Sequence, residues 1–184
     1  MKKTLLAVLA VAALAITSLS AHAQKDPDVG GAAMFPTKNI VENAVNSQDH
    51  TTLVAAVKAA GLVDTLEGPG PFTVFAPTNE AFAKLPAGTV DTLLKPENKA
   101  KLAKVLTFHV VPGRLDSKTL DAQITAGGGK AVLTTVEGET LTVTGSGQSL
   151  MVADNSGDTA HVTIADVYQK NGVILVVDKV LLPK

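Results

Sequence analysis

Apolar and polar positions follow two different periods along this chain, and the period changes near residue 127. Before this point apolar residues recur every three to four positions, which is typical of helices with one buried face. The second of these helices is expected to end at Gly61, which suits the left-handed conformation of a helix cap. The pattern predicts short helices that start at Thr37 or Asn39 and at Asp49 or Thr51, and further helices over 78–85, 89–94, 97–106 and 117–122.

The stretch GPFTVFAPTNEAF, residues 70–82, interrupts these helices with a strand pattern. Apolar side chains alternate over 72–76 with a period of two, which indicates a buried strand. Pro77 cannot donate to a strand ladder, and Thr78 is placed to cap a new helix. Glu80 falls in the first turn of that helix, where the helix dipole favours it. The stretch therefore predicts a strand that leads into a capped helix, a structural anchor rather than an active site.

Beyond Gly127–Gly129 the chain consists of short β-rich runs separated by turn sequences. These runs predict strands over 131–136, 139–144, 149–153, 159–167 and 173–182. The last run is apolar on both faces, so we expect it to lie in the centre of the sheet, and its Asp178 would need a partner if buried. Helices in the first half and antiparallel strands in the second predict an α+β domain.

The first residues have the pattern of a signal peptide. Lys2 and Lys3 precede twelve apolar residues, 5–16, and Ala21-His22-Ala23 supplies small residues where a signal peptidase cleaves. Twelve apolar residues are too few for a membrane span, which needs about 20. The pattern predicts a signal peptide over 1–23 and a periplasmic or secreted protein.

Residues 24–36 carry charges, glycines and two prolines without either period, and they predict a flexible linker. A single domain is then expected over 37–184, because the 161 residues left after export are enough for one sizeable core.

The composition of the exported part narrows the possible partners. It has 14 basic and 17 acidic side chains, a formal charge of −3, with one Tyr and no Trp in the whole chain. Mild acidity and few aromatic residues argue against nucleic-acid binding and against a stacking platform for sugars, while carbohydrate binding through hydrogen bonds stays open. The absence of cysteine excludes a disulfide framework and a lipidated cysteine.

Three separated segments resemble the fasciclin (FAS1) domain family in their order and spacing: GPFTVFAPTNEAF, then LTFHVVPG over 106–113, then VTIADVYQKNGVILVVDKVLLP over 162–183. The resemblance covers roughly residues 37–184. It implies a β-wedge of antiparallel and mixed strands flanked by several short helices. It also implies an exported protein that works in adhesion or binds matrix and cell-surface partners, with no established catalysis and no cofactor. The motif residues to which it gives a structural role are Phe75, Pro77, Thr78, Asn79, Asp166, Gly172 and Asp178.

The resemblance also makes Phe108 and His109 candidate partner-binding residues, since they lie in the segment that the family links to adhesion. Many members carry Tyr-His there, and His in the last motif, where this chain has Phe108-His109 and Leu175. The spacing of His109 from Leu102 and Leu106 favours a packing residue on a helix face instead.

Other candidate sites are weak. A catalytic triad of His109 with Asp116 and Ser117 would lack a nucleophile elbow, and Asp116 and Ser117 are placed to cap a helix. His50 and His161 are isolated, so we expect no metal site. The run 154–158 resembles a calcium loop, but its glycine is at the fourth place and Ala165 stands where Glu should close the loop, which favours a β-turn.

The sequence therefore predicts an exported, non-catalytic binding or adhesion module. We expect a monomer that recognises a cell-surface or matrix protein or a polysaccharide, binds no nucleic acid and does not span the membrane. The alternative is a periplasmic enzyme or small-ligand carrier with a pocket near Phe108 and His109, which a deep cleft with converging polar groups at His109 would favour.

Overall fold

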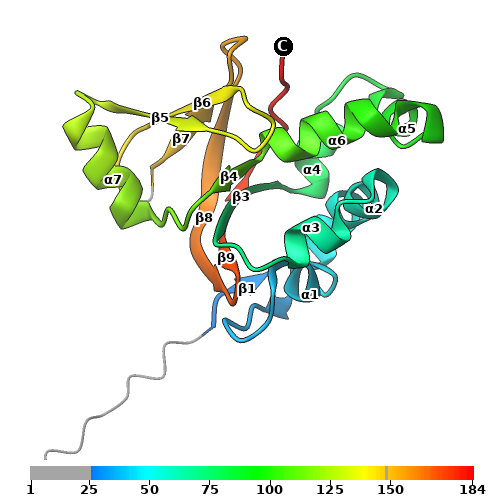
Figure 1. Ribbon diagram of the computed structural model, residues 1–184, viewed down its shortest axis with the longest axis horizontal. Helices are drawn as coiled ribbons and strands as arrows, with labels where there is room; N and C mark the ends of the chain where they lie inside the picture. Colours follow the sequence, from blue (N-terminus) through cyan, green and yellow to red (C-terminus); the bar gives the residue numbers. More distant parts are fainter. Residues whose placement is uncertain (1–25, 148) are drawn as a thin grey trace, which may run out of the picture.

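A mixed seven-stranded sheet in the order β4-β3-β9-β8-β7-β6-β5 forms the centre of the structure, a computed structural model that describes residues 26–147 and 149–184 (Figure 1). Its strands are β3 (Phe72–Pro77), β4 (Val110–Pro112), β5 (Lys130–Thr134), β6 (Thr140–Thr144), β7 (Met151–Ala153), β8 (Thr159–Gln169) and β9 (Gly172–Val177). Neighbouring strands are antiparallel except β3 and β9, which are parallel. The predicted α+β fold is confirmed. The predicted signal peptide, 1–23, lies outside the described residues.

Helices α1 to α6 gather on one side of the sheet, and α7 lies beside β5–β7 on the other side (Figure 1). They are α1 (Ile40–Ala44), α2 (Thr51–Ala60), α3 (Val63–Glu67), α4 (Asn79–Ala83), α5 (Thr89–Leu93), α6 (Lys99–Phe108) and α7 (Ser117–Ala126), with two 3₁₀ turns, η1 (Gln48–His50) and η2 (Pro96–Asn98). No helix within the described ranges is long and apolar enough to cross a membrane.

Several predicted helix boundaries are confirmed by their caps. Asn39 caps α1, and Gly61 ends α2 in the left-handed conformation with φ 72°. The Thr78 hydroxyl accepts a hydrogen bond from the Ala81 amide at 3.2 Å, as expected of an N-cap. α7 extends to Ala126, beyond the predicted end at residue 122, because Ile124 continues its buried face.

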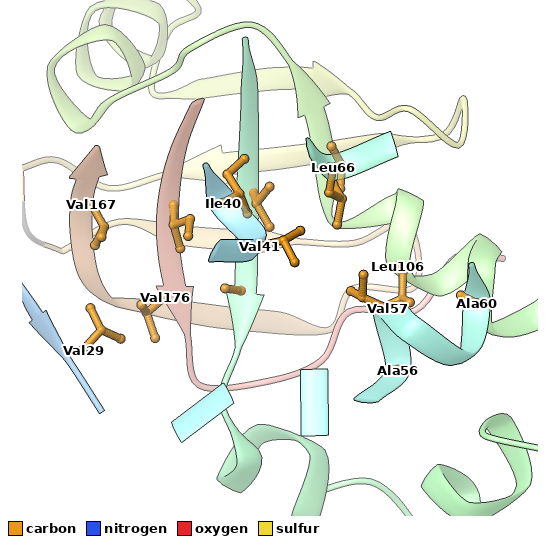
Figure 2. Packing of buried hydrophobic residues seen from close by; sticks show 14 of the residues in the cluster. Val29, Ile40, Val41, Ala56, Val57, Ala60, Leu66, Leu106, Val167 and Val176 are labelled. Atoms are coloured by element: carbon orange, nitrogen blue, oxygen red, sulfur yellow. The ribbon is translucent and has the colours of Figure 1, made fainter. Parts of the chain in front are cut away.

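β9 is buried along its whole length between β3 and β8, so the predicted central position is confirmed. Its side chains alternate between two cores. Ile174 and Val176 pack with α1, α2, α3 and α6, in the cluster drawn in Figure 2, while Leu175 and Val177 pack with α7 and β5–β8. The strand ends at Val177, short of the predicted residue 182, because its pairing with β8 ends there.

The N-terminal segment corrects one prediction. Residues 26–36 are not a flexible linker, since β1 (Asp28–Val29) and β2 (Ala32–Ala33) form a hairpin and Val29 and Met34 are buried in the core. The Gly30 carbonyl accepts a hydrogen bond from the Gln48 amide at 3.0 Å, which ties the hairpin to η1. Val29 and Met34 are only two buried apolar residues in a short segment, so they form neither a helical nor a strand period. The hydrophobic pattern therefore could not predict the hairpin.

The sheet curls until its two outer strands approach each other. The amide of Val136, just after β5, donates to the carbonyl of Val110 in β4 at 2.8 Å. This hydrogen bond joins the two ends of the strand order.

Candidate functional site

Phe108 and His109 lie where α6 passes into β4, and both are buried, with exposed fractions of 0% and 2%. His109 Nδ1 donates to the Val105 carbonyl at 2.8 Å, and its Nε2 accepts from the Leu181 amide at 3.1 Å. Both ring nitrogens are therefore used, and burial lowers the pKa of His109 to about 4, so the ring is neutral at pH 7.

This burial does not agree with direct partner contact by Phe108 and His109. The Phe108 ring packs in the core edge-on to the imidazole of His109, with ring centroids 6.3 Å apart. The packing role that the helical spacing predicts is the one that this geometry supports. The catalytic triad of His109 with Asp116 and Ser117 does not form either. The nitrogens of His109 form hydrogen bonds with Val105 and Leu181 instead.

Asp116 and Ser117 organise the start of α7. The Asp116 carboxylate accepts from the Thr119 amide at 2.8 Å and from the Tyr168 hydroxyl at 3.1 Å, and the hydrogen bonds from Thr119 are the main cause that lowers the pKa of Asp116. Ser117 donates its amide and its hydroxyl to Asp166, at 2.6 and 2.5 Å. Asp166 lies at an irregularity of β8 with φ 59°, a left-handed conformation that aspartate tolerates better than most residues.

The remaining motif residues also serve the fold. Asn79 accepts from the Thr52 amide at 2.9 Å and donates to the Gln48 carbonyl at 2.7 Å, so it holds the start of α2 rather than its own helix. Phe75 is fully buried. A Cβ on Gly172 would lie 2.1 Å from the Phe72 carbonyl oxygen, so only glycine fits beside β3.

Two predicted carboxylate roles can be compared with the structure. Asp178 accepts from the His161 amide at 2.7 Å, which supplies the expected partner, and lies 3.6 Å from Lys84 Nζ. Asp154 accepts from the amides of Ser156 and Asp158 at 2.8 and 3.0 Å, which confirms the predicted turn between β7 and β8. Within residues 26–147 and 149–184, no group of three or more His, Cys, Asp or Glu is placed to hold a metal ion.

Sequence reasoning missed a buried polar clamp between the N-terminal segment and the turn from β8 to β9. Asn43 donates to Gln169 and to the Phe35 carbonyl. Asn171 accepts from the Ile40 amide at 3.0 Å and donates to the Leu66 carbonyl at 2.7 Å. The Asn-Gly pair at 171–172 indicated only a turn, because nothing in its local pattern reports what its amide side chain contacts.

An apolar cavity of about 60 Å³ lies between the helical layer and the sheet. Its walls come from α1, α2, α3, α6, β3 and β9, and include the Val57 and Leu106 side chains labelled in Figure 2. Two histidines, His50 and His109, also line it. The cavity thus reaches the predicted position near His109, but both nitrogens of His109 are already bonded, so no converging polar groups face it there.

His50 differs from His109. It is 3% exposed, its Nδ1 lies 2.9 Å from the Ser47 hydroxyl, and its Nε2 is the one buried side-chain nitrogen or oxygen among the described residues without a hydrogen-bond partner. Burial is the main cause that lowers the pKa of His50. The nearby Ala76 backbone opposes the shift, but no described group meets Nε2 in hydrogen-bonding geometry.

Comparisons with known proteins agree with this fold. The family model of the fasciclin domain matches residues 48–183. Protein sll1483 of Synechocystis sp. is 48% identical over 162 residues, which cover 87% of this chain and 82% of that protein. Cell surface glycolipoprotein MPB83 of Mycobacterium bovis is 35% identical over 167 residues, which cover 88% of this chain and 68% of that protein.

A solved FAS1 domain pair from the insect cell adhesion molecule fasciclin I has the same fold, with a TM-score of 0.69 at 17% identity. The match covers 77% of this chain and 50% of that one. The three motifs, the fold and the match over residues 48–183 agree, and the chain belongs to the fasciclin (FAS1) domain family.

Proposed function

We propose that this protein is an exported, non-catalytic binding or adhesion module that recognises a cell-surface, matrix or envelope macromolecule. Membership of the fasciclin family supports an adhesion-type role, and a relative named as a cell surface glycolipoprotein supports a place outside the cytoplasm. The signal-peptide pattern of residues 1–23 supports export to the periplasm or the medium.

One observation carries the proposal: the polar side chains that were candidates for catalysis or metal binding form hydrogen bonds with the protein's own backbone. Asp116, Asp154 and Asp178 accept hydrogen bonds from backbone amides. Both ring nitrogens of His109 form hydrogen bonds with backbone groups. Groups that are fixed in this way stabilise the domain. Recognition is then a property of exposed side chains on a rigid scaffold.

Two exposed regions offer tests of recognition at the surface. One is the turn from Asn155 to Asp158, and the other is Val132 on β5, whose side chain is 58% exposed. Both are exposed, whereas His109 is buried, so surface recognition and core stability are separable by mutation.

The experiment measures capture of envelope fragments and surface polysaccharides by immobilised protein, together with each variant's unfolding midpoint. The variants are His109→Ala, Val132→Glu and Asn155→Lys. We expect His109→Ala to lower the midpoint while the folded fraction still captures its partner, and the surface variants to keep the midpoint and weaken capture. Abolished capture by a fully stable His109→Ala, or substrate turnover by the wild type, contradicts the proposal.

A further inference from the structure

We propose that the segment after β9, residues 179–184, is a strap that opens more readily as the pH falls, with His109 as the group that releases it. The segment is the red end of the chain in Figure 1, and it belongs to no helix or strand. The inference concerns a conformational change and is separate from the surface recognition proposed above.

Two hydrogen bonds to titratable side chains hold the middle of the strap. The Leu181 amide donates to His109 Nε2 at 3.1 Å. The next amide, that of Leu182, donates to the Asp154 carboxylate at 3.2 Å. A strand ladder would use backbone carbonyls as acceptors, which do not titrate, whereas an imidazole nitrogen accepts only while it carries no proton.

Apolar contacts keep the strap closed at neutral pH. Val180 is 2% exposed and packs with Phe82 and Val105, and Leu181 is fully buried in the core that contains Phe108. Burial of these two side chains stabilises the closed form. Because the strap is not part of a helix or strand, it can detach without breaking one.

A protonated His109 is incompatible with the closed strap. Nδ1 already donates to the Val105 carbonyl, so an added proton goes to Nε2. Nε2 then becomes a donor that faces the Leu181 amide, another donor, and the ring carries a charge in the core. Opening removes the conflict and exposes the ring to water, so uptake of a proton favours the open form.

The charged groups near this contact come from several elements. Asp154, in the turn between β7 and β8, is the charged group that acts on the His109 ring, and it favours the protonated form. Further along the strap, Glu139 accepts from the Lys184 amide at 3.1 Å, and Lys104 of α6 donates to the Lys184 carbonyl at 2.7 Å. The Lys184 amide is the main cause that lowers the pKa of Glu139, so this carboxylate stays ionised at pH 5.

The start of the strap is held by groups that keep their charge or do not titrate. Lys84 of α4 donates to the Asp178 carbonyl at 2.7 Å, and Lys179 forms an ion pair with Asp158. His161 holds the Asp178 carboxylate through its backbone amide, which does not titrate. Histidine is the side chain whose ordinary pKa lies between pH 5 and 7, so His109 is the attachment point most sensitive to pH in this range.

Proton linkage determines the size of the effect. Burial is the main cause that lowers the pKa of His109 to about 4 in the closed form, and exposure would return it towards 6.5. The equilibrium constant for opening therefore rises by up to about 20-fold between pH 7 and pH 5. Amide hydrogen exchange is suited to this measurement, because it detects open forms that are rarely populated.

Hydrogen exchange of the mature protein, followed by NMR at pH 7 and pH 5 and expressed as protection factors, tests the inference. We expect the protection of the Leu181 and Leu182 amides to fall by roughly 5- to 20-fold at pH 5. Their exchange should not change with small additions of urea, because a local opening exposes little surface. The Leu175 and Val177 amides of β9 should stay better protected and should respond to urea, as expected of global unfolding.

Two variants assign the effect to one histidine. His109→Gln keeps an acceptor for the Leu181 amide that does not titrate, so strap protection should be the same at pH 7 and pH 5. His161→Gln removes an exposed histidine and should leave the wild-type pH dependence unchanged. Wild-type strap amides that keep their protection at pH 5, or that share the protection and urea response of β9, would overturn the inference. The same loss in His109→Gln as in the wild type would also overturn it, and the wild-type measurement decides if that variant does not fold.

Discussion

The Asp166 carboxylate accepts two hydrogen bonds from Ser117, one from its backbone amide at 2.6 Å and one from its hydroxyl at 2.5 Å. The pair connects the irregular part of β8 to the first turn of α7, although the two residues lie 49 positions apart. The left-handed Asp166 holds the start of α7 with its side chain, and its carboxylate there meets the positive end of the helix dipole.

Asp166→Ala should therefore lower the free energy of unfolding by about 1–3 kcal/mol, since the Ser117 amide loses its charged acceptor. Ser117→Ala removes only the hydroxyl contact and should cost less. Urea unfolding of both variants measures which substitution lowers the free energy of unfolding more. A loss below about 0.5 kcal/mol for Asp166→Ala, the scale of ordinary surface substitutions, would show that the contact does not stabilise α7.

Phe75→Ala should destabilise by about 3–5 kcal/mol and Val176→Ala by roughly 2 kcal/mol, through lost burial and a new cavity. The two side chains belong to different cores on opposite faces of the sheet. Val132→Ala on the exposed face of β5 is the matched control and should change stability by less than about 0.5 kcal/mol. Thermal or urea unfolding provides the measurement, and a control that cost as much as the core variants would contradict the burial pattern.

Asn171→Ala should cost at least about 2 kcal/mol, because it leaves the Ile40 amide and the Leu66 carbonyl without their partner. Asn155→Ala is the control, because Asn155 is exposed in the turn between β7 and β8. Hydrogen exchange of α1 and α3 amides should rise in Asn171→Ala more than that of α7. Unchanged exchange in α1 would contradict the role of Asn171 as a clamp.

The stability of the protein should fall at acidic pH because His109 is buried in its neutral form. The pKa of His109 is about 4 in the folded protein and near 6.5 when unfolded, so the unfolded chain binds the extra proton first. The contribution of neutral His109 to the free energy of unfolding is complete above pH 6.5 and is lost as the pH falls towards 4. The total loss is on the order of 3 kcal/mol. The lowered pKa of His50 acts in the same direction.

NMR titration of the histidine ring signals between pH 7 and 5 distinguishes these groups. The His109 signals should stay at their neutral positions over this range in the folded protein. A midpoint near pH 6.5 for His109 would contradict its burial and its two backbone hydrogen bonds.

Export predicts a defined N-terminus. Cleavage after Ala23 leaves Gln24 first, and intact-mass measurement of protein from the periplasm or the medium tests this directly. A product that stays in the cytoplasm and retains Met1 would contradict the signal peptide.

The elements that the sequence predicted well have local causes. The strand over 72–77 follows from alternation within the segment, and Thr78, Asn39 and Gly61 cap helices through groups within a few residues. The hairpin at 28–33 depends instead on a contact with η1, some twenty residues later. A two-residue strand has no pattern of its own to read.

The candidate site could be predicted only in part for the same reason. The burial of His109 follows from helical spacing, because its neighbours on α6 are apolar. The unpartnered Nε2 of His50 depends on Ser47, on the walls of several helices and on the β3 backbone, which come together only in the folded chain. His50 therefore looked isolated in the sequence.

The parallel pairing of β3 with β9 also determines when the sheet can be completed during folding. Phe72 pairs with Gly172, one hundred positions later, so this interior strand pair closes only after almost the whole chain is available. A polypeptide that emerges N-terminus first carries Phe75 and Val74 without the strand that covers them, and it stays open until its last residues have followed. For such a chain the topology thus delays completion of the sheet until nearly all residues have emerged.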